Sequence, residues 1–387
     1  MKGSVLKVAI SAAVALPLYF GAQTASANAI ATSYLQIADL EIQINTGDGF
    51  RKAVLGQDIR YQAVVSEGVS STLLNGGQLS ALLNVGGGQD GSGTSGGTAD
   101  VQLNPFGFDL AAQCFGDCDG GFLAGYYGEN SFNYFGDGVA PEPMIAGTGI
   151  NYAVSDMLIA GSALDVAVPP GGITLPGMVL PPGVSIETPA GVDAPVEDSN
   201  GDTFIPEGNI IRLPSADAQT MSDSGITSNG DASASIAEAS VSGSIVALVS
   251  GEIRINFDFN RFVRVGLGAA ALPGSKAQVT DNQFSIKVGN AESCGGVFNA
   301  CVASYDLTTA EGSFVAVTQT PGAVLSAPQS GSGTVSFGIA ENDLVYVDIL
   351  SQTGTSVSLT QQQTVPAPAT LALFGLGLLG LARRRFK

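Results

Sequence analysis

Residues 253–260 read Ile-Arg-Ile-Asn-Phe-Asp-Phe-Asn, with apolar and polar side chains in strict alternation. Successive side chains of a β-strand point to opposite faces, so this alternation predicts a strand with one buried face and one polar face. The same pattern recurs at residues 40–44, 284–288 and 335–339. Because Gly, Asn and Pro separate such stretches, we predict a mainly β ectodomain, an antiparallel β-sandwich or jelly-roll-like fold with Gly/Pro-rich loops.

The composition favours the same fold class. Of 387 residues, 45% are hydrophobic, 13% are charged and 52 are Gly, which indicates a packed core joined by many turns rather than a helical protein. Residues 231–244 alternate small side chains, as expected for a closely packed strand, although their alanines leave a helix open. Residues 71–83 could form a helix, although Gly76-Gly77 divides them.

The chain divides around a proline-rich segment. Seven prolines lie between residues 169 and 195, and proline cannot donate the hydrogen bond that a central strand needs. We predict a first β-rich region of the ectodomain at residues 28–168, a Pro-rich linker or insertion at 169–204, and a second β-rich region at 205–364. The segment is either a boundary between two domains or an ordered surface insertion within one.

The N-terminus has the three elements of a secretory signal peptide. A positively charged start, an apolar run and a small-x-small cleavage site follow in order: Lys2 and Lys7, residues 8–20, and Ala25 and Ala27. Signal peptidase cuts after such a site. We therefore predict a signal peptide at residues 1–27 and export across the inner membrane.

The C-terminus predicts a second targeting element at residues 365–387. It consists of a stiff extended stub, an uncharged apolar run and a basic end: Val365, Pro366 and Pro368, then residues 369–382, then Arg383, Arg384 and Arg385. Fourteen helical residues reach about 21 Å, which is short of the roughly 30 Å hydrocarbon core. We therefore predict a short transmembrane helix that is a poor permanent span. The arginines hold the end of the chain on the cytoplasmic side.

These residues resemble the PEP-CTERM sorting signal of exopolysaccharide-producing Gram-negative bacteria. The order of the three segments is the family's, and Ala367 departs from it, because the family usually carries Glu there. The resemblance implies processing by a membrane exosortase, transient retention at the inner membrane, and delivery to the cell surface or the extracellular space. A similar element occurs in ice-binding proteins, which brings in ice binding by analogy alone.

The charge of the chain excludes one class of partner. Both targeting elements together contain six of the fifteen Lys and Arg residues and none of the 34 Asp and Glu residues, so the remaining chain has an excess of 25 negative charges. Such a chain is repelled by nucleic acid, and we expect no nucleic-acid partner.

Four cysteines form two pairs that are close in sequence: Cys114 with Cys118, and Cys294 with Cys301. In an oxidising compartment we predict two local disulfides across turns. The two crossed connectivities stay open, and a zinc site is the rival interpretation.

The chain has no His and no Trp, which removes His-dependent nucleophilic sites and His-ligated metals. Gly93-Thr94-Ser95-Gly96-Gly97 fits G-x-S-x-G formally but lies in a Gly-rich tract without a preceding strand. Paired carboxylates could still catalyse glycoside hydrolysis, although a chain without Trp must build the aromatic sugar platform from Tyr and Phe. We expect no enzymatic activity and no cofactor other than calcium.

The calcium interpretation rests on Asp198, Asn200 and Asp202, which follow the first, third and fifth positions of an EF-hand-like loop. Thr203 replaces the usual Gly, and Asn209 replaces the bidentate Glu. The alternative is a polar turn without a metal.

The sequence thus predicts a non-catalytic cell-surface or matrix protein that is associated with exopolysaccharide. The alternative is a secreted binding module for carbohydrate, calcium or ice that uses the same export route.

Overall fold

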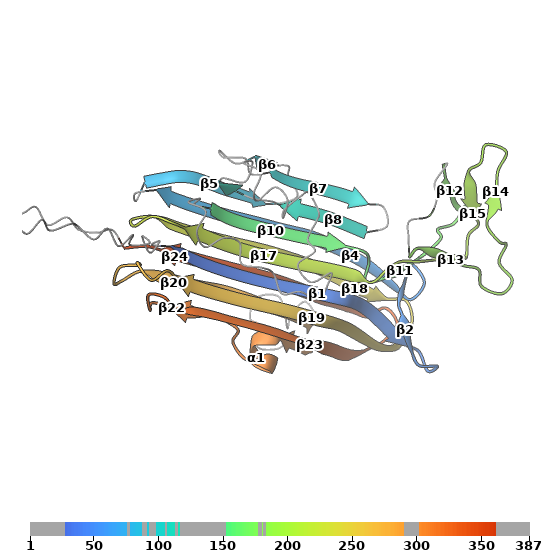
Figure 1. Cartoon of the computed structure of the whole chain (residues 1–387). Coiled ribbons are helices and arrows are strands. Elements are labelled where there is room, and N and C mark those ends of the chain that lie inside the picture. The colour runs from blue at the N-terminus through green and yellow to red at the C-terminus, as the bar shows by residue number, and fades with distance from the viewer. Residues whose placement is uncertain are drawn as a thin grey trace, which may run out of the picture.

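The computed structural model describes residues 28–75, 78–86, 91–92, 98–104, 107–112, 115–116, 152–176, 180, 183–289 and 302–360. These residues form two large sheets, a small third sheet and one short helix (Figure 1). The prediction of a mainly β protein is confirmed. Among the described helices, none has the length and apolar character to span a membrane.

The first sheet has ten strands, and its long members are antiparallel. In spatial order it runs through β23 (Val324–Ile339), β19 (Gly251–Leu267), β1 (Ala29–Asn45), β17 (Ala216–Ile226), β10 (Tyr152–Ala160), β8 (Gly107–Ala112), β7 (Thr98–Asn104) and β6 (Gly91–Ser92), with β2 (Phe50–Lys52) beside β1 and β9 (Phe115–Gly116) beside β10. We call it sheet A.

The second sheet, sheet B, has eleven strands. It runs through β13 (Ser185–Glu187), β16 (Ile210–Arg212), β11 (Asp165–Ala167), β3 (Val54–Leu55), β4 (Ile59–Asn75), β18 (Ala232–Ala247), β24 (Leu344–Ser358), β20 (Lys276–Gly289) and β21 (Ala303–Asp306), with β22 (Val317–Thr318) beside β20 and β5 (Gln78–Gly86) beside β4. The helix α1 (Leu307–Glu311) follows β21 directly.

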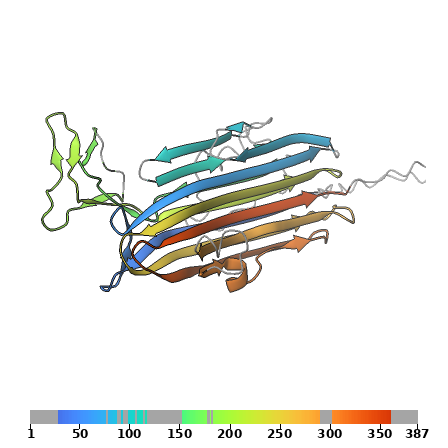
Figure 2. The same cartoon turned by 180° about the vertical axis from the view of Figure 1, so that it is seen from behind.

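Sheets A and B lie one behind the other and share an interior, as Figures 1 and 2 show from opposite sides. The alternating residues of 253–259 point inward as predicted, with Ile253, Ile255, Phe257 and Phe259 all buried. They pack against Phe284 and other buried side chains of sheet B. The period-two pattern therefore identified one wall of the main core correctly.

A second region of the interior is polar. Hydroxyl groups of β17 and β24 meet in three buried pairs at 2.8–3.2 Å: Thr220 with Ser351, Ser222 with Thr353, and Ser224 with Thr355. Each hydroxyl both donates and accepts, so such pairs satisfy one another without water. This short-side-chain ladder lets the two sheets approach closely.

Two helix expectations are settled by the pairing of the strands. Residues 231–244, for which a helix was left open, lie mostly in β18, and the helix considered for residues 71–83 is wrong because residues 71–75 belong to β4 and residues 78–83 belong to β5. β18 pairs with β4 on one side and with β24 on the other. Backbone partners on both sides outweigh the helix propensity of alanine.

Strands from both sides of the proline-rich segment pair with one another. β1 lies between β17 and β19, and β4 lies beside β18. The segment itself supplies a three-stranded sheet of β12 (Ile173–Leu175), β15 (Thr203–Ile205) and β14 (Val196–Glu197), which projects from one end of the large sheets (Figures 1 and 2). We call it the end sheet. The predicted boundaries of the three regions stay predictions.

Candidate functional site

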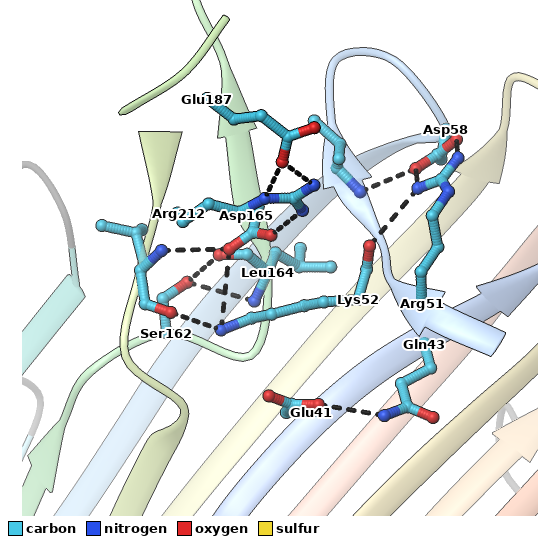
Figure 3. A network of polar contacts seen from close by, with 12 residues as sticks. Glu41, Gln43, Arg51, Lys52, Asp58, Ser162, Leu164, Asp165, Glu187 and Arg212 are labelled. Carbon is cyan, nitrogen blue, oxygen red and sulfur yellow. Dashed lines mark hydrogen bonds and ion pairs between the residues drawn. The ribbon is translucent and has the colours of Figure 1, made fainter. Parts of the chain in front are cut away.

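The described ion pairs gather where the end sheet joins the large sheets (Figure 3). At one side, Arg51 donates from both terminal nitrogens to the two carboxylate oxygens of Asp58, each at 2.6 Å. The Asp58 side chain is buried, and its Oδ2 also accepts from the backbone N–H of Val54 at 2.8 Å. This carboxylate therefore fixes the turn between β3 and β4.

We call this cluster of ion pairs the junction; it consists of Arg51, Lys52, Asp58, Asp165, Glu187 and Arg212. Asp165 lies at its centre. Its residue is 1% exposed, and its carboxylate lies between two cations, Arg212 and Lys52 (Figure 3). The Nζ of Lys52 lies 3.8 Å from Oδ1, and the backbone N–H of Leu213 donates to the same oxygen at 3.0 Å. Arg212 also pairs with Glu187 on β13. One buried carboxylate thus joins β2, β11 and β16.

The charged groups of this junction stabilise the structure. Burial lowers the pKa of the Lys52 ammonium from its usual value, while the Asp165 carboxylate opposes that shift. Lys52 Nζ also donates to the carbonyl of Leu213 at 2.9 Å, so its hydrogen atoms are directed to protein acceptors. Groups that are paired in this way hold the end sheet in place and are not presented to a substrate.

A different arrangement covers the outer face of sheet A. Four side-chain hydrogen bonds form a continuous chain across neighbouring strands: Thr334 to Asn256 at 2.9 Å, Asn256 to Gln43 at 2.8 Å, Gln43 to Glu41 at 3.0 Å, and Ser215 to Glu41 at 2.9 Å. Next to it the Arg254 guanidinium lies 3.6 Å from the centroid of the Phe50 ring. These hydrogen bonds connect side chains of β23, β19 and β1 with Ser215, the residue before β17, and we call this arrangement the polar ladder.

The predicted calcium residues lie in a turn that already uses one carboxylate. Asp198 Oδ1 accepts from the backbone N–H of Asn200 at 2.7 Å and of Asp202 at 2.9 Å, and these bonds lower the Asp198 pKa. The backbone N–H of Asp198 donates to the carbonyl of Asp202 at 2.8 Å. These contacts fit the polar-turn interpretation, and calcium binding stays a prediction.

The remaining predicted sites lie outside the described residues. They are the cleavage-site residues Ala25 and Ala27, the four cysteines Cys114, Cys118, Cys294 and Cys301, the tail residues Val365, Pro366, Pro368, Arg383, Arg384 and Arg385, and the apolar run at 369–382. The signal peptide, the disulfides and the short transmembrane helix therefore stay predictions.

The tail is identified by comparison with known families. A family model described as the PEP-CTERM protein-sorting motif matches residues 364–385. The resemblance seen in the sequence is thereby confirmed: the C-terminal tail carries the PEP-CTERM sorting motif. The motif implies recognition by an exosortase and export to the cell envelope or surface. No curated protein and no solved structure matches the chain.

Sequence reasoning missed Arg51, Asp58, Asp165 and Arg212, because no motif marks them. One signal was available, namely the scarcity of cations. Outside the two targeting elements only nine Lys and Arg residues remain. Three of these nine lie in the junction. A search for ion pairs could therefore have started from the few basic residues of this acidic chain.

Proposed function

We propose that the protein is a non-catalytic surface or matrix protein that an exosortase processes and releases into the exopolysaccharide layer. The observation that carries the proposal is the PEP-CTERM motif at residues 364–385, directly after the last strand of the β body. The body has the organisation of an antiparallel β-sandwich, with two sheets around one interior. We expect this β body to be the part of the protein that is delivered to the cell surface.

One feature supports a non-catalytic role. Asp58 and Asp165, two of the buried carboxylates of the described residues, are bound to cations and backbone N–H groups. A general acid or base needs a carboxyl group that can reach a substrate, and these do not meet that requirement. Glycoside hydrolysis would need two such groups facing one cleft.

Mass spectrometry of the protein from the cell surface and the medium tests the proposal. Peptides of the β body should be recovered without the apolar tail, and deletion of residues 366–387 should bypass membrane retention. Recovery of intact peptides through Phe386 from extracellular material would contradict processing.

The second candidate function is binding of neutral polysaccharide through the polar ladder. Side-chain amides in a fixed arrangement can donate to and accept from sugar hydroxyls. A glycan array, with and without calcium, should then show selective binding that Gln43→Ala with Asn256→Ala removes. The matched control is Gln352→Ala on the opposite sheet. Absence of a selective ligand would leave the matrix role alone.

A further inference from the structure

β23 is an edge strand of unusual length. It pairs with β19 from Val324 to Ile339 without a shift of register, and in the part of the chain that the structure describes no second strand pairs with it. Its 16 residues, at about 3.4 Å each, give an edge of roughly 54 Å. A free edge of this kind presents unpaired backbone N–H and C=O groups.

Solvent reaches this edge on both faces. Residues 324–326 are all exposed, and so are residues 330–332. Neighbouring side chains on a strand point to opposite faces, so at residues 324–326 both faces are open to solvent. At Gly331 the Phe259 ring lies on the inner face, and the outer face at Ser330 and Ser332 is open.

The edge lacks the usual protection against pairing. Natural edge strands carry charges, bulges or proline to block contact with another strand. No charged residue occurs between Glu311 and Glu341, although the whole chain contains 34 acidic residues. Within β23 Pro328 opposes pairing, and beside the strand the Glu311 carboxylate accepts from Gln329 Nε2 at 3.2 Å.

One end of the edge is also apolar. Val315, Val317, Val324 and Leu325 are 50–56% exposed, and they account for four of the nine exposed large hydrophobic residues in the described chain. β22 and β23, which carry three of them, lie in contact. Such a concentration is typical of an interaction surface.

We propose that β23 pairs with β23 of a second copy of this chain, antiparallel about a two-fold axis, so that sheet A continues across the contact. The distribution of charge along the chain favours a second copy at this edge. Two copies of so acidic a chain repel each other over most of their surface, and a stretch of 29 uncharged residues is where they can approach. An antiparallel strand pair is also self-complementary, as a two-fold contact requires.

Cysteine cross-linking tests the contact in cells that produce the full chain. Ser330→Cys and Ser332→Cys, introduced one at a time, should give a cross-linked dimer with a short thiol reagent, because they lie near the middle of β23. Ser242→Cys is the matched control. It is also an exposed strand serine, but β18 has a strand on either side.

A charged substitution on the edge strand is the second test of the proposal. Ser332→Lys should lower dimer formation of the exported protein by at least about tenfold, since like charges that face each other cost several kcal/mol. Ser332→Glu should do the same. An equal mixture of the two variants should restore association, which also shows that both are folded.

Three results would overturn the proposal. They are cross-linking at positions 330 and 332 that does not exceed the Ser242→Cys control, undiminished association of Ser332→Lys, and cross-links that join β23 only to other cell components.

Discussion

Gly333 on β23 lies opposite Phe257 on β19, and the Phe257 ring occupies the space that a side chain at position 333 would need. A Cβ built on Gly333 would lie 2.2 Å from Phe257 Cζ. The neighbouring pair, Gly331 with Phe259, repeats the arrangement. Glycine at these positions lets two core rings reach over the edge strand.

Gly333→Ala should therefore destabilise the protein by about 1–3 kcal/mol, the usual cost of overpacking a core. Gly338→Ala is the control on the same strand, because a Cβ there meets nothing within 4 Å. Urea denaturation of both variants measures the difference. Equal stability of the two would show that the Phe257 ring moves aside without cost.

Removal of the charge of Asp165 should have a larger effect. Asp165→Asn removes the buried carboxylate that the partly buried Lys52 and Arg212 share, and breaking a buried pair in this way costs up to about 3–5 kcal/mol. The Glu187 side chain is 50% exposed, so Glu187→Gln should cost at most about 1 kcal/mol. Denaturation curves give both values. Hydrogen exchange should show that the end sheet loosens first in Asp165→Asn.

Tyr61 should titrate late. Burial raises the pKa of its phenol from 10.0 to about 12, because the neutral form is favoured inside the protein. Since the folded pKa lies above the unfolded value, the contribution to stability is complete below pH 10 and is lost as the pH rises through about 12. Ultraviolet absorbance of wild type minus Tyr61→Phe should show one tyrosine ionising near pH 12. A difference midpoint near the ordinary value of 10.0 would contradict burial of the phenol.

The basic end of the tail should control sorting. Arginine at the middle of a membrane costs about 2.5–3.5 kcal/mol on insertion scales, so we expect the cluster Arg383–Arg385 to hold the end of the chain in the cytoplasm. Replacement of all three by Ser should let the tail pass through and abolish processing. Ala367→Glu should preserve or improve processing, because it restores the residue usual in the family. Immunoblots of membrane and extracellular fractions distinguish these results.

The turn at Asp198 gives a test for calcium. If Asp198, Asn200 and Asp202 bind the ion, millimolar calcium should raise the melting temperature, and Asp202→Ala should abolish that rise. An unchanged melting temperature would favour the polar turn, in which Asp198 accepts from two backbone N–H groups and from the Asn200 side chain.

The sequence could predict β19 because alternation is a local property that a strand with one buried face requires. It could not decide residues 231–244, because their alanines suit a helix and only β4 and β24 make them a strand. The same tertiary pairing accounts for the wrong helix at residues 71–83.

The junction was beyond local patterns for another reason. Asp165 binds Lys52 and Arg212, which lie far from it in the chain, and none of the three belongs to a recognisable motif. The buried hydroxyl pairs of β17 and β24 could not be predicted from the sequence either, because Ser and Thr on strands are usually surface residues.

The position of β1 determines the order in which the chain can fold. This strand opens the described chain, yet its two main neighbours are β17 and β19, about 190 and 230 residues later. Apart from the short β2, which pairs with residues 43–45, an emerging β1 therefore has no described partner strand until β17 at residues 216–226 is available, and contacts so distant in sequence slow folding. β1 must therefore stay without its main partners while most of the chain is made, and the repulsion between acidic chains opposes aggregation during that time.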